Sequence, residues 1–381
     1  MIQMSHIQYL TQIYLESGAI QRIQSECNRL NIKKPLIVTD QGIKSAGILS
    51  KIEQVLGGME YVVFDQTPSN PTQRAAELGK ALYEKHNCDG LIALGGGSSI
   101  DCAKVISILA SHHEPLKNYA TIEGGSNKIT AQVAPLIAVP TTSGTGSEVA
   151  RGVILILDDQ RKVGFHSWHI LPKSAICDPD LTLNLPPYLT AATGMDAIAH
   201  CVETFLNPPF NPTADAIALD GLERAWQNIE LATQDGQHQE ARLQMMTASM
   251  HGAMAFQKGL GCIHSLSHSL GGLFPNLHHG TLNAVFLPAV LRFNAKAQSV
   301  IEQKKMAAIA QKIGVSDESI LPEAMLNLSK RLGLPTGLKD LGIEEAHFDQ
   351  IIQGALKDHC HFTNPRIATF DDYRNILLES M

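Results

Sequence analysis

Residues 90–101 read Gly90-Leu91-Ile92-Ala93-Leu94-Gly95-Gly96-Gly97-Ser98-Ser99-Ile100-Asp101. The apolar run followed by a glycine triplet predicts a buried strand that turns into a helix beginning near Cys102. Glycines let the backbone approach a ligand closely, and the first turn of a helix offers unpaired N–H groups to an anion. A glycine triplet alone also occurs in plain turns, so the interpretation depends on the rest of the chain.

Similar apolar runs recur through the first half of the chain, separated by amphipathic helical stretches. They are Pro35–Thr39, Tyr61–Phe64 and Pro135–Val139. Near-continuous apolar strands that alternate with helices are typical of a parallel sheet covered on both faces. The first half therefore predicts an open α/β domain.

The pattern changes near residue 182. After Leu185-Pro186-Pro187 the strand signals stop, and helical periodicity continues almost to the end of the chain. We expect an α/β protein with an open, mostly parallel dinucleotide-binding sheet domain at residues 1–182. An all-helical, metal-binding domain is expected at residues 183–381.

A second loop strengthens the nucleotide interpretation. Pro140–Glu148 follows a buried strand and is rich in hydroxyl groups and glycines. Two donor-rich loops at the carboxyl ends of parallel strands mark the place where α/β sheets bind nucleotides. Asp40 follows the strand ending at Thr39 and is suited to accept hydrogen bonds from a ribose, which favours NAD over NADP; the alternative is an ordinary turn aspartate before Gly42. Neither loop matches the Gly-x-Gly-x-x-Gly or Walker A pattern.

The helical half carries carboxylate and imidazole groups at helical spacing. Asp196 and His200 are four residues apart, as are His264 and His268, and a third cluster is His278-His279. Side chains at i and i+4 share one helix face, so each pair can direct two ligands at one point. Since no cysteine is required, the set indicates an open catalytic metal site rather than a thiolate-rich structural one. The alternative is a set of unrelated helix residues.

Composition limits the other function classes. The 381 residues carry a net charge of -7 without a Lys/Arg block, which argues against nucleic acid and membrane partners. Seven dispersed cysteines without a Cys-x-x-Cys pair indicate reduced thiols in a cytoplasmic protein, and no apolar run is long enough to span a membrane.

Together these motifs resemble the iron-containing alcohol dehydrogenases along essentially the whole chain. The resemblance is carried by Gly95–Asp101, Pro140–Glu148, Asp178–Thr182, Gly194–Glu203 and His279–Asn283. It implies that Asp196, His200, His264 and His279 bind the metal and that His268 lies beside the substrate. Because the spacer before His278-His279 varies among relatives, counting alone also permits His278; Gly280 and Asn283 favour His279.

The resemblance also implies the cofactor contacts, to which Asp101 at the end of the glycine loop is added. The expected NAD-binding residues are Asp40, Asn70, Gly96, Gly97, Ser98, Asp101, Thr141, Thr142, Thr145 and Lys162. Fe(II) is implied by the resemblance alone, because oxygen and imidazole donors suit Zn(II) and other divalent ions equally.

The expected reaction is NAD-linked oxidation of an alcohol, with His268 relaying the released proton. Phe165–His169, Lys258–Cys262 and Leu277–Pro288 resemble the family members that interconvert 4-hydroxybutyrate and succinate semialdehyde. Arg151, His166 and Arg366 are candidate partners for the substrate carboxylate.

Other functions stay open. One is a general primary alcohol or diol dehydrogenase of the same family. Another is a dehydroquinate synthase-like lyase, which has a related fold but needs a basic cluster that this chain lacks. A third is a non-catalytic protein that binds a metal or a nucleotide. Such a protein would not need both the donor-rich loops and the set of carboxylate and imidazole groups. Relatives are often oligomeric, so a homodimer is expected.

Overall fold

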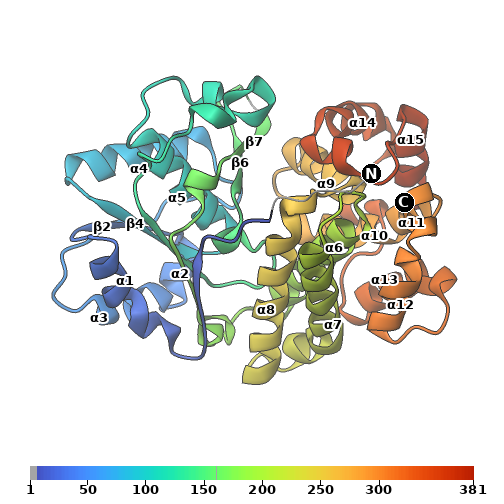
Figure 1. The fold of residues 1–381 in the computed structure, drawn as a ribbon, viewed down its shortest axis with the longest axis horizontal. Helices are drawn as coiled ribbons and strands as arrows, with labels where there is room; N and C mark the ends of the chain where they lie inside the picture. The colour runs from blue at the N-terminus through green and yellow to red at the C-terminus, as the bar shows by residue number, and fades with distance from the viewer. Residues whose placement is uncertain (1–6, 160) are drawn as a thin grey trace. The chain divides into compact units, whose positions relative to one another are not determined.

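The computed structural model describes residues 7–159 and 161–381, which form two compact units. Residues 9–142 and 146–185 make an α/β unit, and residues 143–145 and 186–381, with residues 7 and 8, make a helical unit (Figure 1). The sequence analysis placed the whole second loop in the first domain. Residues 143–145 instead group with the helices, because Gly144 packs directly on Thr193.

The α/β unit is built on a six-stranded parallel sheet in the order β1-β8-β5-β4-β2-β3. Its strands are β1 (Gln12–Leu15), β2 (Pro35–Val38), β3 (Val62–Phe64), β4 (Gly90–Gly95), β5 (Leu136–Pro140) and β8 (Ser174–Cys177). An antiparallel pair, β6 (Gly152–Ile156) and β7 (Lys162–His166), lies outside this sheet.

Both faces of the sheet are buried, as the apolar runs predict. Along β4, Leu91 and Ala93 belong to one core cluster, whereas Ile92 and Leu94 belong to a second. The helices of this unit are α1 (Ile23–Arg29), α2 (Gln41–Ser45), α3 (Ile48–Leu56), α4 (Gln73–Lys85) and α5 (Gly97–Leu109). Since successive strand residues point to opposite faces, a strand buried on both sides needs an unbroken apolar run.

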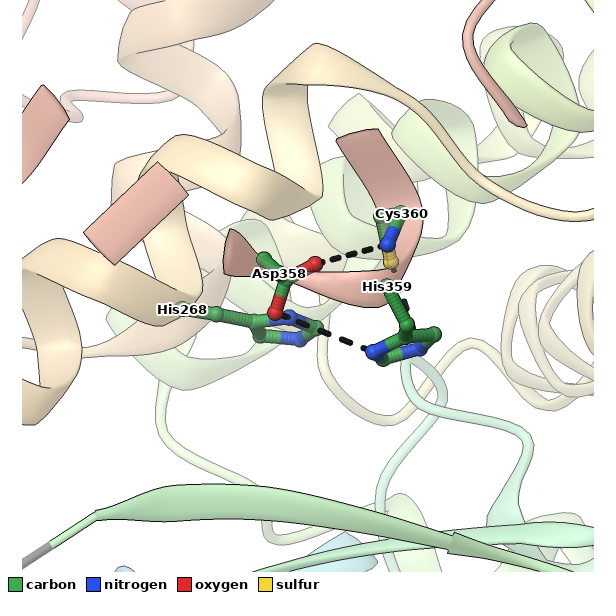
Figure 2. Close-up of side chains that lie close together, drawn as sticks. All are labelled: His268, Asp358, His359 and Cys360. Carbon is green, nitrogen blue, oxygen red and sulfur yellow. Dashed lines mark hydrogen bonds and ion pairs between the residues drawn. The ribbon is translucent and has the colours of Figure 1, made fainter. Parts of the chain in front are cut away.

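In the described part of the helical unit, ten α-helices surround one large core. They are α6 (Pro187–Leu206), α7 (Pro212–Gln234), α8 (Gln239–Ala255), α9 (Cys262–Leu273), α10 (His279–Asn294), α11 (Gln298–Glu302), α12 (Lys305–Ile313), α13 (Leu321–Arg331), α14 (Phe348–Lys357) and α15 (Phe370–Glu379). The short 3-10 helix η12 (His359–Thr363) contacts α9, so that side chains of the two elements face each other (Figure 2).

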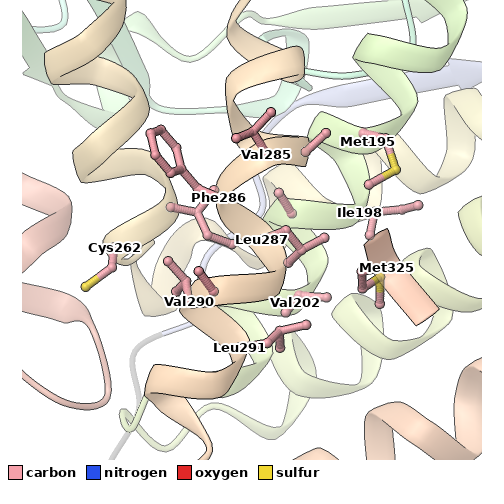
Figure 3. Close-up of a cluster of buried hydrophobic side chains, with 14 of the residues drawn as sticks. Met195, Ile198, Val202, Cys262, Val285, Phe286, Leu287, Val290, Leu291 and Met325 are labelled. Atoms are coloured by element: carbon pink, nitrogen blue, oxygen red, sulfur yellow. The ribbon is translucent and has the colours of Figure 1, made fainter. Parts of the chain in front are cut away.

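Packing between α6 and α10 fixes the part of this unit that carries the candidate metal ligands. Met195 and Ile198 of α6 pack in one cluster with Phe286 and Leu287 of α10 (Figure 3). A Cβ on Gly280 would lie 2.0 Å from the carbonyl oxygen of Ala192, so only glycine allows this approach. This packing therefore fixes the distance between α6 and α10, and with it the distance between the candidate metal ligands on the two helices.

The predicted fold class is confirmed, and four of the sheet strands lie within one residue of their predicted ends. The apolar runs do not predict β1, β8 or the β6–β7 pair. Within the described ranges, no helix is long and apolar enough to cross a bilayer.

Candidate active site

The glycine loop follows β4 and leads directly into α5. Gly95 has φ 148°, and a Cβ there would lie 2.6 Å from Oγ of Ser99, so glycine is required. Gly96 is the N-cap of α5, and a Cβ on it would lie 3.2 Å from Oγ1 of Thr142. Because these glycines carry no side chain, a ligand can approach the backbone closely at the N-terminus of a long helix. An anion is stabilised at such a helix terminus.

The second loop is joined to the first. The backbone N–H of Thr141 donates to the carbonyl of Gly95 at 3.1 Å. Oγ1 of Thr141 is buried and finds no hydrogen-bond partner in the part of the chain that the structure describes. A buried hydroxyl without a partner is costly, which fits a position that a ligand completes.

Asp40 lies at the carboxyl end of β2, next to the glycine loop. Its Oδ1 accepts a hydrogen bond from the backbone N–H of Ile43 and caps α2, while Oδ2 accepts one from Oγ of Ser99 at 3.2 Å. The order of strands reverses between β2 and β4, which is where open α/β sheets bind nucleotides.

Three more of the expected cofactor residues are placed by side-chain hydrogen bonds. Nζ of Lys162 donates to Oδ1 of Asn70 at 3.1 Å, which joins β7 to the loop before α4. Oγ of Ser98 donates to the carbonyl of Ser69 at 2.5 Å. The structure thus brings together residues that are far apart in sequence.

Asp101 has a different environment from the other expected cofactor residues. Its carboxylate accepts hydrogen bonds from Oγ of Ser147 at 2.5 Å and from the backbone N–H of Ile154 at 3.0 Å. The neighbouring Lys104 is fully buried and donates to Ser147 and to two backbone carbonyls. Both of the oxygens of Asp101 therefore hold the second loop and β6 against α5.

The expected metal ligands converge in the helical unit. Oδ1 of Asp196 lies 3.5 Å from Nε2 of His200 and 3.7 Å from Nε2 of both His264 and His279. Ligand atoms about 2.1 Å from a shared ion at tetrahedral angles lie about 3.4 Å apart. Asp196, His264 and His279 each offer an atom within 4.8 Å of the others, and His200 stacks on His264 beside this group. At this spacing, Asp196, His264 and His279 could hold a metal ion.

Two neighbours orient the imidazoles. Nδ1 of His264 donates to Oε2 of Glu203 at 2.6 Å, and Nδ1 of His200 donates to the carbonyl of Gly144 at 3.2 Å. With one proton held on Nδ1, each ring presents Nε2 toward Asp196. An ion can bind at Nε2 of His264 once that nitrogen has released its own proton.

Asn283 supports the same interpretation from α10. Its Nδ2 donates to Oδ1 of Asp196 at 2.7 Å and lies 3.2 Å from Nε2 of His264 and of His279. Its Oδ1 is buried without a hydrogen-bond partner among the described residues. A buried carboxylate, converging imidazole nitrogens and an unpaired amide oxygen fit a divalent cation.

The pKa values of the converging carboxylate and imidazoles agree with a site that binds a cation. Burial lowers the pKa of His200 to about 4, which keeps this ring neutral. Burial also lowers the pKa of His264, but hydrogen bonds to Asp196 and Glu203 offset this and raise it to about 9. Burial raises the pKa of Asp196, yet the surrounding imidazoles hold it far below its usual range. Without an ion, the site draws a proton to His264.

His268 and His278 lie beside the group without belonging to it. Nδ1 of His268 donates to Oδ2 of Asp358 at 3.0 Å, and Figure 2 shows these two side chains together. The ring of His268 also stacks on that of His279. Nδ1 of His278 is buried and makes no hydrogen bond within the described ranges. The geometry therefore favours His279 as the third imidazole.

Comparisons with known proteins show the family to which the chain belongs. The model described as "Iron-containing alcohol dehydrogenase" matches residues 11–179, and "Fe-containing alcohol dehydrogenase family, C-terminal" matches residues 190–381. The chain belongs to the iron-containing alcohol dehydrogenase family. Its members are metal-dependent and NAD(H)-dependent enzymes. Because dehydrogenases are oxidoreductases, the protein is an oxidoreductase.

Individual iron-containing alcohol dehydrogenases match over nearly the whole chain. The protein is 60% identical to a 4-hydroxybutyrate dehydrogenase of Cupriavidus necator, covering 99% of this chain and 100% of that one. A crystal structure of a 1,3-propanediol oxidoreductase gives a TM-score of 0.93 at 35% identity, covering 99% and 100% of the two chains. A sulfoacetaldehyde reductase from Bifidobacterium kashiwanohense in complex with NAD+ gives a TM-score of 0.89 at 26% identity, covering 100% and 98%.

Sequence reasoning gave no role to two residues that orient the site. The position of Glu203 near the site could have been predicted, because it lies seven residues after Asp196 and so shares its helix face. Asp358 gave no such signal, since ninety positions separate it from His268.

Proposed function

We propose that the protein is a metal-dependent, NAD-linked dehydrogenase that interconverts 4-hydroxybutyrate and succinate semialdehyde. The observation that carries the proposal is the 60% identity, over the full length of both chains, to the 4-hydroxybutyrate dehydrogenase of Cupriavidus necator. The donor groups around Asp196 supply the chemistry that such a reaction needs.

Asp196, His200, His264 and His279 are the proposed metal ligands. Glu203 and the Gly144 carbonyl hold two of the rings in the required tautomer. We propose Fe(II) as the resident ion, on the basis of family membership, with Zn(II) as the alternative that the donor set allows equally. When bound, such an ion supplies Lewis acidity and NAD supplies a hydride acceptor.

The proposed NAD site is formed by the glycine loop and the second loop. The backbone at Gly96, Gly97 and Ser98 faces the pyrophosphate at the N-terminus of α5. Asp40 would accept hydrogen bonds from the ribose hydroxyls, and Thr141, Thr142 and Thr145 belong to the second loop. Asn70 and Lys162 act as one hydrogen-bonded pair. Asp101 acts through the loop that it holds.

His268 is the proposed proton acceptor during alcohol oxidation. Because Asp358 keeps the ring proton on Nδ1, Nε2 carries the lone pair that takes up a proton. The side chain is largely buried, with 11% exposed, so its orientation is restricted. A proton relay needs an imidazole held in a fixed orientation.

Arg151 differs from the other two candidates for the substrate carboxylate in the partners of its side chain. His166 is already hydrogen-bonded to Thr121 and packed between Gly152 and Gly164. Arg366 forms an ion pair with Asp372. Arg151 stacks on the ring of Trp168 at 4.7 Å, and no acidic side chain of the described ranges pairs with it. An arginine with its fork unused is suited to bind a carboxylate.

The experiment is a comparison of steady-state rates, followed as NADH formation, for 4-hydroxybutyrate, 1,3-propanediol and 1-butanol. The proposal expects the highest kcat/KM for 4-hydroxybutyrate. A preference for 1,3-propanediol would instead support a diol dehydrogenase, as would fit the 38% identical 1,3-propanediol dehydrogenase of Citrobacter freundii. No NADH from any alcohol would overturn the proposal.

We further propose a cytoplasmic location and a homodimer. All seven cysteines are free and buried, as expected in a reducing compartment. Sedimentation of the purified protein would decide its oligomeric state.

A further inference from the structure

A second group of metal-binding side chains lies next to His268. Asp358, His359 and Cys360 are consecutive in sequence, at the start of η12, and they face His268 of α9 (Figure 2). Each of the four offers one ligand atom, and these atoms lie within 4.8 Å of one another. None of Asp358, His359 and Cys360 belongs to the proposed metal site around Asp196.

The thiol and one imidazole already have the spacing of two ligands of a single ion. Sγ of Cys360 lies 3.4 Å from Nε2 of His359. Sulfur and nitrogen ligands of one tetrahedral zinc ion lie about 3.6 Å apart. The pair therefore needs little movement to bind an ion.

Asp358 prepares both imidazoles for metal binding. Its Oδ2 lies 3.0 Å from Nδ1 of His268 and 3.7 Å from Nδ1 of His359. A carboxylate at these positions favours the proton on Nδ1 and leaves Nε2 of each ring unprotonated. Its Oδ1 is occupied by the backbone N–H of Cys360 at 2.8 Å, which fixes the carboxylate in place.

The donor types and their exposure restrict the ion. Thiol and imidazole donors select borderline-soft ions such as Zn²⁺ over Mg²⁺ and Ca²⁺. The side chain of His359 is 37% exposed, whereas Cys360 is buried. An ion would therefore reach the group from the His359 side.

We propose that Cys360, His359 and His268, with Asp358 orienting the two imidazoles, form a second, inhibitory Zn²⁺ site. On binding, the Sγ–H bond breaks, its proton passes to the buffer, and Sγ bonds to the ion without any change in oxidation state. Occupancy draws His268 away from proton transfer, so added zinc slows alcohol oxidation. This inhibitory effect rests on the role proposed for His268, whereas the binding does not.

The test is a titration of the holoenzyme, containing its resident metal, with Zn²⁺ while metal content and rate are both measured. Wild-type protein is expected to bind a second equivalent as its rate falls. C360S and H359Q are expected to bind that equivalent at least about 100-fold more weakly. C27S is the control, since Cys27 is equally buried but lies in the α/β unit. H359Q serves if C360S does not fold.

Co²⁺ provides a spectroscopic readout, because a thiolate ligand adds a sulfur-to-cobalt charge-transfer band that C360S should lack. The proposal is wrong if wild-type protein takes up no second equivalent. It is also wrong if C360S keeps both that equivalent and the inhibition. Failure of the proposed function would appear separately, as no NADH formation before zinc is added.

Discussion

Oε2 of Glu203 lies 2.6 Å from Nδ1 of His264, and both side chains are almost completely buried. The other oxygen, Oε1, accepts a hydrogen bond from the backbone N–H of Ile263 at 2.7 Å. One carboxylate of α6 therefore fixes both the start of α9 and the tautomer of a metal ligand on it. Although Glu203 would not touch the ion, it determines how His264 presents Nε2.

Replacing Glu203 by glutamine should weaken metal binding. Since both carboxylate oxygens accept hydrogen bonds, E203Q must place its amide nitrogen against one of two donors. We expect metal affinity to fall about 10- to 100-fold, measured by competition with a chelator. E318Q, at an exposed position of the same unit, is the control. Equal affinity in the two variants would show that the hydrogen bond does not orient the ligand.

The choice between the two adjacent histidines can be tested by metal content. His279 directs Nε2 toward Asp196 at 3.7 Å, whereas His278 is outside the group of converging donors. H279A should therefore lose the ion and the activity with it. H278A should retain about one equivalent per chain. The opposite pattern, measured by elemental analysis, would assign His278 as the ligand.

Much of the site could be predicted because its residues repeat at helical spacing. Asp196 and His200 share a face of one helix, so their convergence follows from sequence alone. Gly144 could not be predicted as a neighbour of His200, since it lies in a loop after a strand and acts through its backbone carbonyl. Because every residue type carries a backbone carbonyl, the sequence does not indicate which carbonyl will make such a contact.

The fold also contains strands that the sequence predicts and strands that it does not. β4 was predictable because both of its faces are buried, which requires an unbroken apolar run. β1, by contrast, is an edge strand with the polar Gln12 and partly buried residues, so it resembles a loop in sequence. Its place depends on pairing with β8, which is more than 150 residues away in the chain.

Cofactor preference should change when Asp40 is replaced by serine. Serine also caps a helix, so α2 should be retained, while the carboxylate that disfavours a 2'-phosphate is removed. We expect the ratio of kcat/KM for NAD to that for NADP to fall about 10- to 100-fold, the effect of one or two charge-assisted hydrogen bonds. D89S is the control because Asp89 precedes β4, at the opposite end of the sheet. An unchanged ratio in D40S would place the ribose elsewhere.

Glu148 should make the stability of the protein depend on pH. Burial raises the pKa of this carboxyl from 4.5 to about 7, so the folded state binds more protons than the unfolded chain between these values. The free energy of unfolding should therefore fall as pH rises from 4.5 to 7, by about 3 kcal/mol from this group. Burial lowers the pKa of the adjacent Lys104 to about 8, so its own change lies above this range.

E148Q should remove this dependence, because glutamine resembles the neutral carboxyl at every pH. Urea unfolding of wild type and E148Q from pH 4.5 to 7 would measure the difference, with E77Q at an exposed position as control. Stability curves that run parallel for wild type and E148Q would show that Glu148 titrates normally in the folded protein.

Arg151 should determine the preference for a substrate that carries a carboxylate. Its guanidinium stacks on Trp168 and can bind a carboxylate with two parallel hydrogen bonds. In R151Q we expect kcat/KM to fall about 10- to 100-fold for 4-hydroxybutyrate, mainly through KM, and to change little for 1-butanol. R161Q is the matched control, because Arg161 already forms ion pairs with Asp159 and Glu123. Since an arginine that serves only to pack on Trp168 would affect both substrates, an equal loss with 4-hydroxybutyrate and 1-butanol would remove Arg151 from the carboxylate site.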